Sequence, residues 1–122
     1  MNKFIIDLII NNYLFELPYF NSQEELNEYI GEEVPIKFND DKIYDYINQW
    51  EMDHKFSVIY DEVDSYDLED MYVIREVVFT MDEKYYRLYY EESYENANRL
   101  YSPPYEVYPV EKTVTEYYAK ER

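Results

Sequence analysis

The fold is indicated most clearly by the segment 71–92, which reads MYVIREVVFTMDEKYYRLYYEE. Its two ends, Met71–Phe79 and Tyr85–Glu92, are rich in Val, Ile, Phe and Tyr, which favour β-strands. The mostly polar residues Thr80–Lys84 between them are few enough to connect two antiparallel strands, although no Gly marks the turn. We therefore expect a β-hairpin here.

Further strands are expected on both sides of this hairpin. Lys55–Val63 has the same β-branched and aromatic composition, and Glu106–Tyr118 returns to it after a loop predicted over Ser93–Pro104. Two consecutive prolines end that loop, and Pro109 suits an edge strand or a bulge, because proline has no backbone N–H. These patterns predict an antiparallel sheet of roughly three to five strands.

The first half of the chain has helical patterns. Apolar residues recur three and four positions apart from about Asn2 to Leu14, predicting an amphipathic helix that is closed by Pro18. Ser22, followed three residues later by Glu25, is a capping box for a second helix, and Gly31 stands where that helix needs a left-handed terminal residue.

A third helix is predicted after the cap segment Asn39-Asp40-Asp41, with an apolar face made of Ile43, Tyr46, Ile47 and Trp50. Helices followed by strands indicate an α+β fold, with N-terminal helices packed on a C-terminal antiparallel sheet. A chain of 122 residues without repeats or a linker indicates a single domain, 1–122, with its helical part at about 1–54 and its sheet part at about 55–122.

The composition excludes several kinds of chemistry. The chain has no Cys, so it has no disulfide scaffold, Cys-based zinc site or cysteine nucleophile. A single Gly rules out Gly-rich phosphate loops and the G-x-S-x-G elbow. The only His, His54, follows the third helix, where a solvated cation is a simpler interpretation than a catalytic or ligand role. We expect no enzyme activity, no metal site and no cofactor.

The net charge of −17 opposes direct binding to nucleic acid or to anionic lipid. No apolar stretch reaches the ~18 residues of a membrane span, and no cleavage site follows the short apolar run at the N-terminus. We therefore expect a soluble cytoplasmic protein.

The acidic residues gather in stretches that contain no Lys or Arg. A solvated surface that aids solubility accounts for most acidic proteins, but a small domain needs a net charge of only ~2 to 8 for that purpose. The excess favours a basic partner, whose Arg and Lys would otherwise contact phosphates. The candidate partner-binding residues are Asp61, Glu62, Asp64, Asp67, Glu69, Asp70, Glu91, Glu92 and Glu95.

Ten of the 18 Tyr residues lie in the last third of the chain, several of them in consecutive pairs. Consecutive residues of a strand point to opposite faces, so one Tyr of each pair can pack in the core while the other meets solvent or a partner. Tyr is a common strand former, and it is also enriched in interfaces, where its ring stacks on Arg.

The C-terminal stretch EVYPVEKTVTE, residues 106–116, resembles the closing segment of small acidic proteins carried by phages and mobile elements of low-GC Gram-positive bacteria. Size, acidity and the lack of catalytic groups also resemble anti-CRISPR and antirestriction proteins, which mimic nucleic acid. The resemblance implies an inhibitor and assigns no individual residue.

We therefore expect an inhibitor that occludes the basic nucleic-acid groove of a host defence nuclease, such as a Cas9-type effector. Two alternatives stay open. One is an immunity protein that neutralises a basic nuclease toxin, which a toxin gene directly upstream would favour. The other is an accessory phage protein that self-associates through an edge strand, for example as a homodimer.

Overall fold

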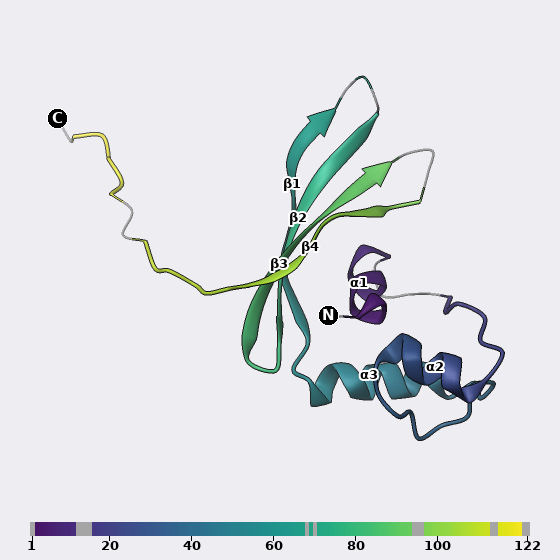
Figure 1. The fold of residues 1–122 in the computed structure, drawn as a ribbon. Coiled ribbons are helices and arrows are strands. Elements are labelled where there is room, and N and C mark those ends of the chain that lie inside the picture. Colours follow the sequence, from purple (N-terminus) through teal and green to yellow (C-terminus); the bar gives the residue numbers. More distant parts are fainter. Residues whose placement is uncertain are drawn as a thin grey trace.

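The computed structural model describes residues 2–11, 16–67, 69, 71–93, 97–112 and 115–120. Within them, three helices precede four strands along the chain (Figure 1). The elements are α1 (Lys3–Ile10), α2 (Gln23–Ile30), α3 (Ile43–Asp53), β1 (Ser57–Asp67), β2 (Tyr72–Met81), β3 (Lys84–Ser93) and β4 (Arg99–Val107). The strands form one antiparallel sheet in the order β1-β2-β3-β4, which confirms the predicted α+β class.

β2 and β3 form the predicted hairpin. They pair from Tyr72 opposite Ser93 to Met81 opposite Lys84, and the turn consists of Asp82 and Glu83 alone. Both turn residues have positive φ angles, 50° and 67°, as a two-residue type I′ turn requires. Because Gly adopts such angles at less cost, this Gly-free turn carries backbone strain.

β1 is longer than the sequence indicated. The predicted strand ended at Val63, whereas β1 continues to Asp67. Its register with β2 shifts between Val58 and Tyr60 and again between Val63 and Ser65. Such bulges insert an extra residue without ending the ladder. As a result, the acidic residues from 61 to 67 lie on a strand at the edge of the sheet.

Two predictions for the C-terminal part are wrong. The predicted loop Ser93–Pro104 overlaps β4, which begins at Arg99 and includes both prolines. They are tolerated because β4 is an edge strand, and because they lie where its register with β3 shifts. Of the strand predicted over Glu106–Tyr118, only Glu106 and Val107 belong to a strand, at the end of β4. Residues 108–112 and 115–120 form no strand. We call residues 108–112 and 115–120 the C-terminal arm; this part of the chain extends away from the rest (Figure 1).

The first helix begins beside Asn2 as predicted, and the caps of the second helix agree with its sequence pattern. The Asn2 side chain caps α1, which ends at Ile10, and the predicted end at Leu14 lies outside the described residues. In α2, the Ser22 hydroxyl accepts a hydrogen bond of 3.3 Å from the Glu25 N–H, and Gly31 ends the helix with a φ of 87°. Both features confirm the predicted start and end of α2.

The predicted cap of α3 is wrong. The helix begins at Ile43 after Lys42, which makes no side-chain capping bond. Asp40 instead accepts a hydrogen bond from the Lys42 N–H at 2.9 Å in the turn before the helix. The apolar face of α3 is nevertheless as predicted, since Ile43, Ile47 and Trp50 are buried.

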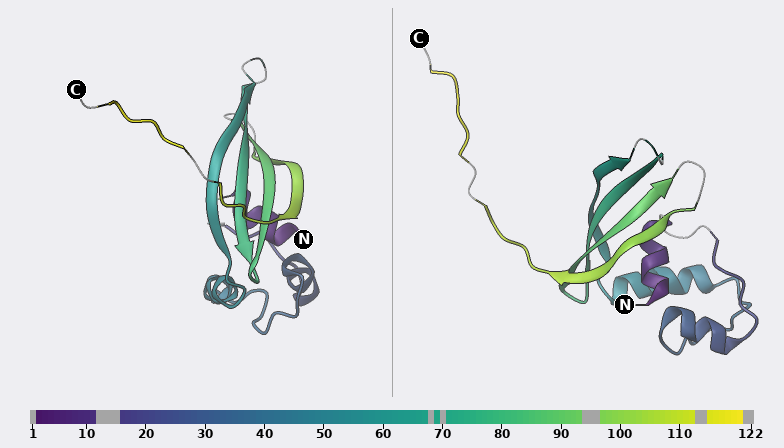
Figure 2. Two further views of the ribbon diagram at one scale, coloured as in Figure 1. Left: turned by 90° about the vertical axis from the view of Figure 1, so that its left-hand side faces the viewer. Right: turned by 45° about the horizontal axis from the view of Figure 1, so that its top comes forward.

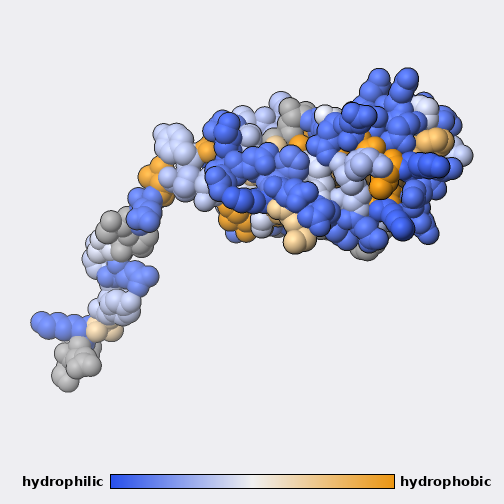
Figure 3. All heavy atoms as spheres, turned by 90° about the horizontal axis from the view of Figure 1, so that it is seen from below, coloured by the Kyte–Doolittle hydropathy of each residue, from blue (hydrophilic) through white to orange (hydrophobic). Residues whose placement is uncertain are grey.

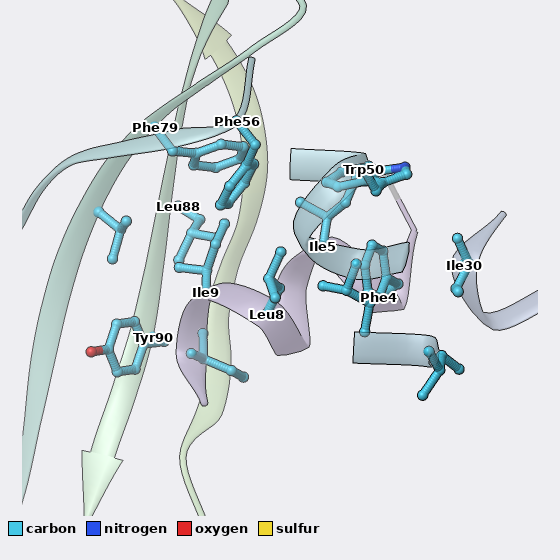
Figure 4. Packing of buried hydrophobic residues seen from close by; sticks show 14 of the residues in the cluster. Phe4, Ile5, Leu8, Ile9, Ile30, Trp50, Phe56, Phe79, Leu88 and Tyr90 are labelled. Atoms are coloured by element: carbon cyan, nitrogen blue, oxygen red, sulfur yellow. The ribbon is translucent and has the colours of Figure 1, made fainter. Parts of the chain in front are cut away.

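The hydrophobic core lies between the helices and one face of the sheet, which we call the inner face. Phe4 of α1 is fully buried and meets the Trp50 ring edge to face, with 5.1 Å between ring centroids. Figure 4 shows these side chains with Phe79 and Leu88 of the sheet, which are also fully buried. No described helix is long and apolar enough to cross a membrane.

The opposite face of the sheet, which we call the outer face, is not covered by a described helix (Figure 2, left). The consecutive Tyr residues of β3 divide between the two faces as predicted. Tyr86 stacks on Phe79 and Tyr90 is buried on the inner face. Tyr89 lies opposite Glu76 on the outer face.

Candidate functional site

The structure places the predicted partner-binding residues mainly on two strands. Asp61, Glu62, Asp64 and Asp67 belong to β1, and Glu69 lies in the turn that follows. Glu91 and Glu92 belong to β3. Asp70 and Glu95 lie outside the described residues.

The sheet divides these residues between its two faces. Asp61 is opposite Val77, an inner-face residue, whereas Glu62 is opposite Glu76 on the outer face. Residues directly opposite in an antiparallel ladder share a face, and neighbours along a strand alternate. Their proximity in the sequence suggested one continuous acidic surface. The acidic residues do not form such a surface, because they lie on both faces of the sheet.

Asp61 takes part in a network on the inner face. Arg75 Nε lies 2.7 Å from Asp61 Oδ1, and the Tyr90 hydroxyl donates to Asp61 Oδ2 at 2.9 Å. The hydrogen bond to Asp61 raises the pKa of the Arg75 guanidinium, and burial, followed by the bond to Asp61, raises the pKa of Tyr90. Glu92 Oε1 lies 3.9 Å from the same Arg75. Asp61 and Glu92 are thus compensated within the chain.

Glu91 also has an internal partner. Its Oε2 accepts a hydrogen bond of 3.1 Å from Arg99 of the neighbouring strand β4. Arg99 itself is largely exposed, so a partner protein could compete for this pair. Glu91 is therefore a weaker candidate for binding than the sequence indicated.

The remaining acidic residues of β1 and its turn are more accessible. Glu62, Asp64 and Glu69 are exposed, and no ion pair joins any of them to a Lys or Arg of the described chain. Asp67 is half-buried and accepts a hydrogen bond from the Glu69 N–H at 3.0 Å. We call Glu62, Asp64, Asp67 and Glu69 the acidic edge.

Glu76 on the outer face was not among the predicted residues. It accepts hydrogen bonds from the Tyr60 and Tyr89 hydroxyls at 2.6 and 2.8 Å, and Arg87 Nε lies 3.7 Å from its Oε2. The Tyr60 bond, then the Tyr89 bond and the Arg87 charge, lower the pKa of Glu76. The same carboxylate raises the pKa of Tyr89 to about 12. Only the register of β2 with both neighbours brings these residues together.

A groove lies beside this network, at the start of the C-terminal arm. It has a volume of about 630 Å³ and lies between β1, the outer face and the arm. Its lining residues are Ile59, Tyr60, Val78, Tyr85, Arg87, Val107, Tyr108, Pro109 and Val110. Figure 3 shows apolar surface where the arm joins the rest of the molecule.

His54 lies at the end of α3, as predicted, and links the helices to the hairpin turn. Its Nδ1 is 3.1 Å from the Asp82 carboxylate, and its ring packs on Trp50 with 4.5 Å between centroids. Glu32 lies 3.8 Å from Nε2. This arrangement joins two parts of the fold. Across the described residues, no group of three or more His, Asp or Glu is placed to hold a metal ion.

Comparisons of the chain with protein-family models, with curated proteins and with solved structures found no match. The site has three parts: an acidic edge, an aromatic outer face, and an apolar groove between them and the arm.

Proposed function

We propose that this protein is a phage- or mobile-element-encoded inhibitor that acts in the host cytoplasm on a defence nuclease. It occludes the basic nucleic-acid groove of a Cas9-type effector and competes with DNA there. The observation that carries this proposal is the acidic edge, whose residues Glu62, Asp64 and Glu69 are exposed and have no Lys or Arg partner in the described chain.

The spacing of the carboxylates along the acidic edge can be compared with the spacing of phosphates along DNA. Glu62 and Asp67, with Asp64 between them, are five steps apart along the strand, or about 17 Å at ~3.3 Å per residue. That is one carboxylate per ~6 to 8 Å, compared with one phosphate per ~3.4 Å along a single DNA strand. The edge thus has about half the charge density of one DNA strand, so contacts beyond charge must contribute to the affinity.

Those further contacts come from the outer face. Tyr60 and Tyr89 lie there beside Glu76, and Tyr85 lines the adjacent groove. Tyr rings supply rigid contact area and stack on guanidinium groups. A groove that binds nucleic acid is rich in Arg and Lys, so carboxylates and tyrosines side by side are complementary to it.

A displacement assay tests the proposal. A fluorescent DNA duplex is bound to a guide-loaded Cas9-type effector, and the protein is added at about 0.15 M and then about 0.5 M NaCl. We expect displacement at the lower concentration and much weaker displacement at the higher one, because salt screens exposed charges. Full DNA binding at both concentrations, with no protein retained on the effector, overturns the proposal.

A further inference from the structure

The C-terminal arm has a strand-forming sequence but no strand partner. Residues 108–118, YPVEKTVTEYY, are rich in Val, Thr and Tyr, which favour β-strands. In the structure, Tyr108, Val110, Tyr117 and Tyr118 are 66–92% exposed, and the described part of the arm forms no ladder. Local sequence preference and observed structure therefore disagree in this segment, and a missing partner strand would reconcile them.

One edge of the sheet is suited to receive such a strand. β1 is eleven residues long and pairs only with β2, so its other edge has no strand beside it in the described chain. An edge of this length is a template for pairing with another chain. The opposite edge strand, β4, is less suitable because Pro103 and Pro104 have no N–H to donate.

The arm begins close to β1 and leads away from its own molecule. Pro109 and Val110 line the groove together with Ile59 and Tyr60 of β1. In Figure 2 (left) the arm crosses in front of the outer face from β4 towards β1 and continues beyond it. Residues 110–120 contain no Gly, Asn, Asp or Pro that would favour a reversal. An extended arm that leaves past its own β1 is placed to reach another molecule.

The charges favour the arm over a second β1 as the occupant of this edge. β1 carries four carboxylates and no Lys or Arg, so two β1 edges repel each other. Residues 111–120 carry Glu111 and Glu116 but also Lys112 and Lys120, which makes this part of the arm neutral within a chain of net charge −17.

We propose that the C-terminal arm of one copy adds as a strand along the free edge of β1 in a second copy, reciprocally, so that two copies form a closed dimer. The exchange is symmetric, because each copy supplies one arm and one edge. The added strand would pair with the backbone of β1, and the Glu62 side chain would stay on the outer face. The dimer therefore goes beyond the proposed function and does not depend on it.

The test compares two arm variants by sedimentation equilibrium at about 0.15 M NaCl. Pro replaces Thr115 and Glu116 in one variant, so that at least one removed N–H faces the partner edge; Ala replaces both in the control. We expect the wild type and the Ala variant to have about twice the chain mass of 15.2 kDa, and the Pro variant to have the chain mass alone. Circular dichroism checks that all three are folded.

Hydrogen exchange locates the interface. Backbone amides of β1 are expected to be protected in the wild type and to exchange faster in the Pro variant, while β4 is unchanged. A wild type that is monomeric at about 0.5 mM overturns the proposal, whether its arm is free or folds onto its own chain. A Pro variant that stays dimeric, or a change in protection at β4 instead of β1, also overturns it.

Discussion

Replacing Glu76 by Gln tests the polar network of the outer face. Glu76 accepts hydrogen bonds from the Tyr60 and Tyr89 hydroxyls. A hydrogen bond to a charged group contributes about 1.5–3 kcal/mol. The Glu76 side chain is 22% exposed and Gln keeps one acceptor, so the loss is smaller than two such bonds. We expect Glu76→Gln to lower the free energy of unfolding by about 1–2 kcal/mol at neutral pH.

The loss of unfolding free energy in Glu76→Gln should depend on pH. The hydroxyl donors lower the pKa of Glu76 in the folded protein, relative to about 4.3 in the unfolded chain. A group of this kind stabilises the fold above its unfolded pKa, and its contribution is lost as the pH falls through its folded pKa. The difference between wild type and Glu76→Gln should therefore be complete at about pH 6 and should shrink below about pH 4.

Glu62→Gln is the matched control. Glu62 lies directly opposite Glu76 on β1 and is exposed, so the two carboxylates repel each other. Removing the Glu62 charge should raise the free energy of unfolding by about 0.2–1 kcal/mol. Urea denaturation followed by Trp50 fluorescence measures both variants. A Glu76→Gln protein as stable as wild type at neutral pH, or an equal loss in Glu62→Gln, would show that the hydrogen bonds to Glu76 do not stabilise the fold.

Three further predictions concern stability. Gly31→Ala should lower the free energy of unfolding by about 1–3 kcal/mol, because φ is 87° and a Cβ would collide with the Asn2 side chain. An unchanged urea midpoint contradicts this prediction. Glu83→Gly should raise the thermal midpoint by a few degrees, because Gly relieves the positive φ at the hairpin turn and the lost contact with Lys55 is exposed; a lower midpoint in a thermal scan contradicts it. Raising NaCl from about 0.05 to 0.5 M should raise the urea midpoint, since salt screens the repulsion within a chain of charge −17; a fall would show that repulsion is not limiting.

Local patterns predicted the elements that local interactions determine. The Ser22 cap and Gly31 fix the two ends of α2 by hydrogen bonds and backbone conformation within a few residues. The hairpin of β2 and β3 likewise depends on two adjacent runs of strand-forming residues. By contrast, β4 contains Pro103 and Pro104, which a strand tolerates only at an edge or a bulge. Edge position depends on strand order, which the local pattern does not contain.

The candidate site was only partly predictable for a similar reason. The sequence identified the acidic stretch that begins at Asp61, but the pairing of Asp61 with Arg75 depends on the register between β1 and β2. The bulge between Val63 and Ser65 then changes which side chains share a face. Glu76 was missed because its donors come from two other strands. Charge alone therefore located the region, and the register decides which carboxylates stay available.

Charge reversal of the acidic edge is the most direct test of whether this edge binds the nuclease. Two variants each replace four acidic residues by Lys, so both carry a net charge of −9. The edge variant changes Glu62, Asp64, Asp67 and Glu69; the control changes the exposed residues Glu16, Glu28, Glu33 and Glu106. Circular dichroism checks that both are folded, and their dissociation constants for a guide-loaded Cas9-type effector are then measured.

Four interfacial charge pairs at about 0.5–1 kcal/mol each correspond to a loss of about 30- to 1000-fold in affinity. We therefore expect the edge variant to bind at least about 30-fold more weakly than the wild type and the control to lose less than about fivefold. An edge variant that binds as tightly as the control would show that the acidic edge does not bind the effector.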